Sequence, residues 1–80
     1  MYTYRAMAVL PNAHMDRATS LLRGELYRRV IADDETEVPD WSTLSVTGPV
    51  EAFGPRGDLC FEYRASVACR SLRERLAAHA

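Results

Sequence analysis

The 80-residue chain contains no lysine, since all ten of its basic residues are arginines. It also contains no apolar run approaching the roughly 20 residues that a membrane-spanning helix needs, which excludes such a helix. Near its beginning, the apolar stretch at residues 6–10 is shorter than the hydrophobic region of a signal peptide, and Arg5 is the only basic residue beside it. These absences predict a cytoplasmic protein with no membrane partner.

Cysteine is scarce as well. Cys60 and Cys69 are too few for a disulfide framework, and we expect both thiols to be reduced. His14 and His79 could add two ligands for a zinc ion, but no CxxC or HxxxH spacing prearranges such a site. The acidic run at residues 33–40 lacks the alternation and the glycine of a calcium loop. We therefore predict no metal and no cofactor.

The motifs of common catalytic sites are missing too. There is no P-loop, no GxGxxG, no GxSxG and no HExxH. Neither histidine is accompanied by a pattern of acid and nucleophile, and nothing indicates a basic partner that would activate Cys60. A chain of this size also has little room for a pocket beside its core. We expect that the protein is not an enzyme, and we assign no catalytic residue.

Charge of both signs is present but unevenly placed along the chain. Residues 1–32 carry five Arg against two acids, net +3; residues 33–62 carry eight acids against one Arg, net −7; residues 63–80 carry four Arg against one acid, net +3. The total is −1, so no global attraction to nucleic acid is expected. Such a chain can satisfy its charges within one fold or attract a copy of itself.

A strand and a helix are predicted in the first half. Residues 2–10 (YTYRAMAVL) are typical of a short strand ended by Pro11, although either alternating set could face inward. A helix is expected from Asn12, a good N-cap, to about residue 32. Its apolar stripe is Met15, Ala18, Leu22, Leu26 and Val30. Gly24, opposite the stripe, indicates either neutral drift or the close approach of another backbone.

Two strands are predicted in the second half, after an acidic linker at residues 33–40. The first, residues 41–53, is broken by Gly48-Pro49; because proline cannot donate to a ladder, we expect an edge strand with a bulge there. The second, residues 58–68, alternates apolar with polar or small residues, which predicts one core face. Its apolar set is Leu59, Phe61, Tyr63, Ala65 and Val67.

Arg56-Gly57-Asp58, between these two strands, matches the tripeptide that integrins read on secreted adhesion proteins. The stretch GPRG, residues 54–57, has the two glycines and the proline that suit a hairpin connection. We interpret the tripeptide as part of a hairpin turn. Because no secretion is expected, we predict no integrin partner.

The predicted fold class is α+β, a single domain over residues 1–80 with the order β-α-β-β. The hairpin makes the last two strands antiparallel, and placing the last strand in the middle gives an antiparallel three-stranded sheet of order 1-3-2 with Pro49 on an edge. One long amphipathic helix covers one face. A short C-terminal helix is predicted after Ser71, and this segment or a second copy could cover part of the other face.

We expect a non-catalytic protein–protein interaction module that associates with itself, as a homo-oligomer, or with another protein. This function is favoured by the missing catalytic motifs, by the uneven charge and by a predicted sheet with only one face covered by the helix. Candidate interaction residues lie on the helix exterior, on the exposed sheet face and on the edge strand. They are Arg17, Arg23, Arg28, Arg64, Glu62 and Pro49.

Two alternatives stay open. Nucleic-acid or regulatory binding could use the helix arginines, although the near-neutral charge and the acidic middle argue against a nucleic-acid partner. The element order also resembles that of dodecins, small flavin-binding β-α-β-β proteins with a tryptophan near the second strand, where this chain has Trp41. That resemblance implies a small-ligand binder, but it is limited to topology, since the dodecin Trp-Phe-Glu-Val run is not matched.

A further resemblance lies in the runs YRAMAVLPNAHMDRATSLLRGELYRRV and VTGPVEAFGPRGDLCFEYRASV, in a chain without lysine and rich in arginine and alanine. These runs resemble small uncharacterised accessory proteins of bacteriophages that infect actinobacteria, including mycobacteria. The resemblance covers most of the chain and rests on composition and general residue pattern rather than on a defining motif. It implies a protein of the host-cell cytoplasm that binds and redirects a host protein.

Overall fold

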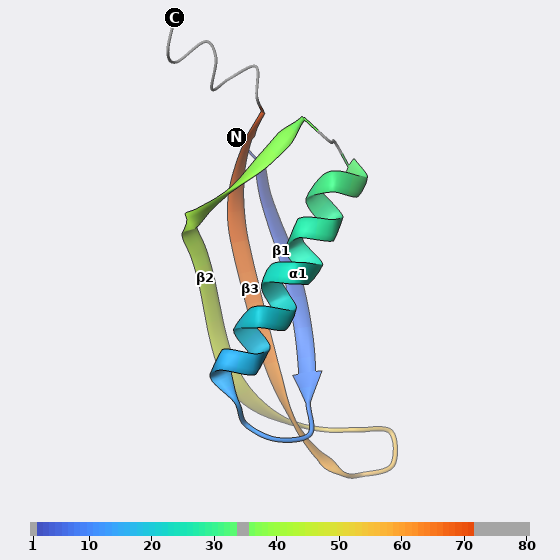
Figure 1. The fold of residues 1–80 in the computed structure, drawn as a ribbon. Coiled ribbons are helices and arrows are strands. Elements are labelled where there is room, and N and C mark those ends of the chain that lie inside the picture. Colours follow the sequence, from blue (N-terminus) through green and yellow to red (C-terminus); the bar gives the residue numbers. More distant parts are fainter. Residues whose placement is uncertain (1, 34–35, 72–80) are drawn as a thin grey trace, which may run out of the picture.

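Three strands and one helix make up the part of the chain that this computed structural model describes, residues 2–33 and 36–71 (Figure 1). In chain order they are β1 (Tyr2–Leu10), α1 (Met15–Asp33), β2 (Glu37–Phe53) and β3 (Leu59–Ser71). The predicted α+β class and β-α-β-β order are confirmed. The predicted C-terminal helix lies outside the described residues.

The strands form one antiparallel sheet of order β1-β3-β2, as predicted, with β3 in the centre. β1 pairs with β3 along its whole length, and its last residue, Leu10, lies opposite Phe61. β2 pairs with the other edge of β3 and reaches the pair Phe53–Leu59 beside the turn. β3 therefore extends past β1, and the sheet ends as a two-stranded hairpin.

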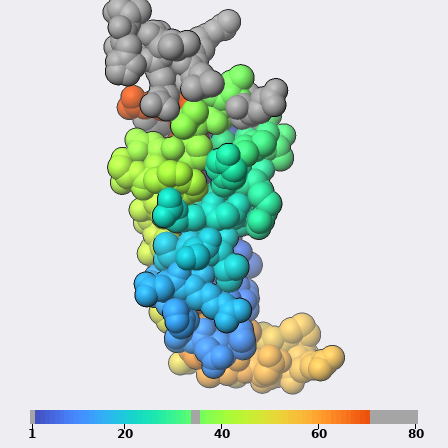
Figure 2. Space-filling model, viewed as in Figure 1, coloured from blue at the N-terminus to red at the C-terminus, as the bar shows by residue number. Residues whose placement is uncertain are grey.

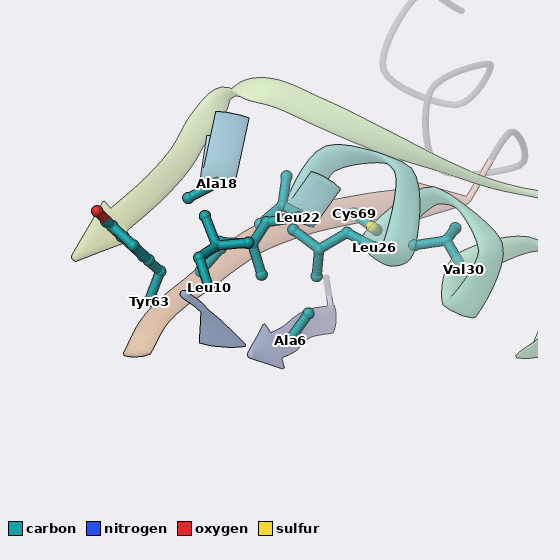
Figure 3. Close-up of a cluster of buried hydrophobic side chains, with 10 residues drawn as sticks. Ala6, Leu10, Ala18, Leu22, Leu26, Val30, Tyr63 and Cys69 are labelled. Carbon is teal, nitrogen blue, oxygen red and sulfur yellow. The ribbon is translucent and has the colours of Figure 1, made fainter. Parts of the chain in front are cut away.

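The core lies between α1 and one face of the sheet (Figure 3). Four residues of the predicted helix stripe are buried, whereas the first, Met15, is 41% exposed. On β1 the core residues are Ala6 and Leu10, which settles the alternation that the sequence left open. The buried residues of β3 that join this core are Tyr63, Ala65, Val67 and Cys69. The other face of the sheet is not covered by α1.

α1 begins later than predicted because His14, rather than Asn12, is its N-cap. The His14 Nδ1 atom accepts a hydrogen bond from the Arg17 backbone N–H at 3.0 Å, and the His14 carbonyl accepts one from the Ala18 N–H at 3.0 Å. The backbone N–H of His14 donates to the Tyr63 hydroxyl at 2.9 Å. This tertiary hydrogen bond ties the helix start to β3, and a local reading of the sequence does not reveal it.

β2 begins at Glu37, so the prediction of an acidic linker up to residue 40 is wrong for its second half. β3 runs on to Ser71, past the predicted end at residue 68, and offers Glu37 and the residues after it a pairing edge. Glu37 is buried at this end of the sheet. Strand pairing thus overrides the acidic composition that favoured a loop.

β2 turns sharply partway along its length (Figure 1), where the register shifts between Asp40 and Ser45. The Thr43 hydroxyl donates to the Asp40 carbonyl at 2.7 Å and accepts from the Ala68 N–H at 2.9 Å. This side chain satisfies a backbone donor at the break in the ladder. The irregularity also places Trp41, partly buried, against the core.

A second irregularity confirms the predicted bulge at Gly48-Pro49, where the peptide bond is cis. Gly48 has a φ of 123°, and a Cβ there would lie 2.7 Å from the Glu62 carbonyl oxygen and 3.1 Å from the Tyr63 ring. The bulge therefore requires glycine. Gly24 in α1 differs, because the nearest atom to an added Cβ is the end of an arginine side chain at 4.0 Å. Within the described residues, an added Cβ at Gly24 meets no backbone of another element within 4 Å, so the suggested close approach is not found there.

The connection between β2 and β3 is a hairpin turn, as predicted. The Gly54 N–H donates to the Asp58 carbonyl at 2.8 Å, and the Gly57 N–H donates to the Gly54 carbonyl at 2.9 Å. Arg56-Gly57-Asp58 therefore belongs to the turn, while the lack of an integrin partner stays a prediction. Figures 1 and 2 show that this end of the hairpin extends beyond the start of α1.

Candidate interaction surfaces

The face of the sheet opposite α1, which we call the open face, carries rows of side chains that cross all three strands. Cross-strand partners point to the same face of a sheet, so the pairing register identifies neighbours. The first row is Arg5, Ser66 and Ser45, and the second row is Met7, Arg64 and Thr47. Guanidinium and hydroxyl groups thus dominate the middle of this face.

These two rows line an open hollow of about 560 Å³, which Ala6, Ala65 and Arg29 also line. Arg29 belongs to α1, and its Nη1 atom donates to the Arg5 carbonyl at 3.2 Å, beside β1. We call this site the basic hollow, because its described lining holds three arginines and no carboxylate. Its arginines come from three different elements of the fold.

Two of the three arginines of the basic hollow are held by a carboxylate at Nε. The Arg64 Nε donates to Glu62 at 2.7 Å, and the Arg29 Nε donates to Glu25 at 3.2 Å. Hydrogen bonds from Arg28 and then Arg29 lower the pKa of the Glu25 carboxyl. Such exposed ion pairs add little stability, so their main consequence is to orient the guanidinium groups.

The predicted surface residues divide between several places. Arg64 and Glu62 lie on the open face and bond to each other. At about 100° per residue, Arg17 and Arg28 fall on the side of α1 away from the sheet. Arg23 falls on its flank, with its guanidinium 4.8 Å from the centroid of the Trp41 ring. The helix arginines do not share one surface, and their binding of a partner stays a prediction.

The last predicted residue, Pro49, is exposed and precedes a second candidate surface, the hairpin end, which we define as residues 50–61. Here Phe53 is 77% exposed and Leu59 is 45% exposed. The two residues are cross-strand partners, and by alternation they share the face of β3 that carries Phe61 and Tyr63 to the core. The core face of β3 therefore continues into solvent at the hairpin end.

The lengths of the elements explain this exposure. The 19 residues of α1 rise about 1.5 Å each and span about 28 Å. The 13 residues of β3 rise about 3.3 Å each and span about 43 Å. Because His14 fixes the start of α1 beside Tyr63, the uncovered length falls at the hairpin end.

The predicted surface residues did not include Arg5, Arg29 or Phe53. Arg5 alternates with the core residue Ala6, so knowing the inward face of β1 would have placed it on the open face. Arg29 lies four residues after Glu25 in a favourable helix pair, but its reach to β1 depends on tertiary packing. The exposure of Phe53 follows from where the helix stops covering the sheet, which local patterns do not encode.

Two titratable groups near the other end of the sheet are perturbed. The Tyr4 hydroxyl donates to Asp33, and this hydrogen bond, together with burial, raises the pKa of Tyr4. Burial and the nearby Glu37 raise the pKa of the Cys69 thiol. Cys60 and Cys69 are both free and buried. A protonated, buried thiol is a poor nucleophile.

Among the described residues, no helix combines the length and apolar character needed to cross a membrane. This part of the chain also brings together no group of three or more His, Cys, Asp or Glu side chains that could hold a metal ion. The predicted lack of a cofactor and of enzymatic activity stays a prediction.

The chain matches no protein-family model, and no curated protein or solved structure is similar enough to it to count as a match. The resemblance to accessory proteins of actinobacterial phages therefore stays a prediction.

Proposed function

We propose that this protein is a small interaction module that acts by protein–protein contact, and that its partner at the hairpin end is a second copy of itself. The observation that carries the proposal is the exposed pair Phe53 and Leu59, which continues the core face of β3 beyond the cover of α1. Adjacent exposed apolar side chains, especially aromatic ones, that are surrounded by polar residues often mark contact surfaces. Single exposed apolar residues are common and seldom do so.

The local architecture supports the need for a partner. β1 stops opposite Phe61, so the hairpin end has only two strands. A two-stranded hairpin without a packed face is marginal in water, whereas packing of its apolar face stabilises it. Burial in a contact would remove the Phe53 and Leu59 side chains from water.

The charges around this patch favour a second copy as the occupant. Glu51 and Asp58 flank it, and Arg56 lies in the same turn. In a two-fold arrangement each copy presents the same patch, so Arg56 of one copy can approach the acids of the other. The net charge of −1 gives two copies little mutual repulsion. The resemblance to phage accessory proteins is compatible with this role.

Sedimentation analysis over low to high micromolar concentrations tests the proposal. We expect a reversible dimer for the natural chain and a shift to monomer for Phe53→Ser and Leu59→Ser. Tyr27→Ser is the matched control, because Tyr27 is also large, apolar and exposed but lies on α1. A natural chain that stays monomeric throughout, or a control that dissociates as strongly as Phe53→Ser, contradicts self-association through the hairpin end.

A further inference from the structure

The basic hollow lies on the face of the sheet opposite the one that continues to Phe53, so it is separate from the proposed contact. Arg5 comes from β1, Arg29 from α1 and Arg64 from β3, and all three line one open space. Its volume of about 560 Å³ falls within the range of small-molecule sites in proteins. Three guanidinium groups that surround one open space indicate a binding site rather than scattered charges on a solvated surface.

The ion pairs of the hollow leave the outer nitrogens of the arginines available. Arg64 is bound to Glu62 through Nε alone, so its two terminal nitrogens have no partner among the described residues. Arg29 uses Nε and Nη1, which leaves Nη2. The Arg5 guanidinium has no hydrogen bond or ion pair within the described part of the chain. Two arginines are thus each bonded to a carboxylate through Nε, and the third adds a positive charge that has no ion pair among the described residues.

Hydroxyl groups add neutral donors to the same space. Ser45 and Ser66 lie in the row of Arg5. Thr47 lies in the row of Arg64, but its hydroxyl donates to the Arg64 carbonyl at 3.5 Å. Met7, which is 53% exposed, adds an apolar contact in the second row. The hollow therefore offers several charged donors, two serine hydroxyls and a small apolar contact.

We propose that the basic hollow binds the phosphate monoester group of a small molecule. A carboxylate has two oxygens, which one guanidinium can satisfy in a bidentate pair, whereas a phosphate monoester presents three terminal oxygens and about two negative charges. Three arginines and the hydroxyls of Ser45 and Ser66 match the larger number of acceptors. Arg5 supplies the charge that the Glu62 and Glu25 pairs do not cancel, and Met7 contacts the apolar part of the ligand.

Calorimetric titration of the full chain with phenyl phosphate tests this site, with benzoate as the carboxylate counterpart. We expect saturable binding of phenyl phosphate that weakens as salt is added, and binding of benzoate at least about tenfold weaker. Arg5→Gln and Arg64→Gln should each weaken phenyl phosphate binding about tenfold or more, since each removes a charge-assisted donor. Arg17→Gln is the control, because it removes the same charge from the far side of α1.

Variants that keep the fold make the outcome decisive. Arg5→Lys retains the charge but loses the planar pair of donors, so an intermediate affinity supports the proposal even if Arg5→Gln fails to fold. Phe53→Ser should bind phenyl phosphate like the natural chain, which separates this site from self-association. Equal losses in Arg17→Gln and Arg5→Gln, or no saturable binding by the natural chain, overturn the proposal. So does binding of a single-stranded oligonucleotide through Arg5 and Arg64 without binding of phenyl phosphate.

Discussion

The two faces of the sheet are built from the same three strands, yet they differ in almost every property. The face under α1 buries small apolar side chains such as Ala6 and Ala65 against a helix stripe with no charge in it. The opposite face presents Arg5 and Arg64, the immediate neighbours of those alanines, to solvent. Strand alternation alone produces this contrast. One face therefore carries the packing that stabilises the fold, and the other is exposed.

The contrast has a limit along the length of the sheet. Near Tyr63 the covered face is sealed by α1, whereas at Phe53 the same face is bare. The molecule thus offers two different surfaces, an apolar one at the hairpin end and a basic one in the middle of the open face. Their separation means that a substitution in one should leave the other unchanged.

The largest expected effect comes from truncating a residue of the covered face. Leu26 is 0% exposed in the centre of the core, and Leu26→Ala should lower the free energy of unfolding by about 3 kcal/mol, through lost burial and a residual cavity. Met7→Ala, on the open face, should cost less than about 0.5 kcal/mol. Urea denaturation measures both. Similar losses in the two variants would mean that the open face is covered in solution.

A second substitution tests the bulge that leads from the body of the sheet to the hairpin end. Gly48→Ala places a Cβ 2.7 Å from the Glu62 carbonyl oxygen at a positive φ, and should cost about 2 kcal/mol or more. Gly57→Ala is the matched control, since its φ is also positive, at 78°, but an added Cβ meets nothing within 4 Å. It should cost about 1 kcal/mol. Equal thermal unfolding shifts for the two variants would argue against the close approach at Gly48.

A third substitution tests which residue caps the N-terminus of α1, the helix that covers this face. His14→Ala removes the side-chain acceptor for the Arg17 N–H and should cost about 1 kcal/mol, whereas His14→Asn retains an acceptor and should cost less. Asn12→Ala, at the position that the sequence favoured as the cap, should change stability by less than about 0.5 kcal/mol. Chemical denaturation of the three variants compares them. A larger loss from Asn12→Ala than from His14→Ala would restore Asn12 as the cap.

Much of the fold was predictable because its signals are local. The stripe from Ala18 to Val30, the bulge at Gly48-Pro49 and the glycine-rich turn each follow from residue spacing or from backbone restrictions. Sheet order followed from hairpin geometry and from the demand that proline lie on an edge. These inferences needed no knowledge of distant contacts.

The errors have a common physical cause, which is pairing between residues far apart in the chain. The cap at His14 depends on Tyr63, 49 residues away, and the strand start at Glu37 depends on β3 reaching Ser71. The basic hollow likewise depends on a register that sets Arg5 opposite Ser66. Alternation could suggest which residues face outward, but not which strands bring them side by side.

The smallest expected effect concerns pH, at the edge of the covered face where the Tyr4 hydroxyl donates to Asp33. Because the folded pKa of Tyr4 is raised above its ordinary value of 10.0, the unfolded chain releases this proton at a lower pH than the folded chain does. The contribution is therefore fully present below pH 10 and should be lost as pH rises above that value. The lack of lysine simplifies the measurement, since tyrosines and cysteines dominate alkaline titration.

Free energies of unfolding measured in urea at several pH values from 8 to 11 should therefore fall less steeply for Tyr4→Phe than for the natural chain. Tyr27→Phe, which changes an exposed tyrosine on α1, should keep the steeper dependence. The comparison is one of slopes, so a modest loss of stability in either variant does not affect it. Parallel slopes for Tyr4→Phe and the natural chain would show that the Asp33 hydrogen bond does not form in solution, and that the end of α1 is not tied to β1 there.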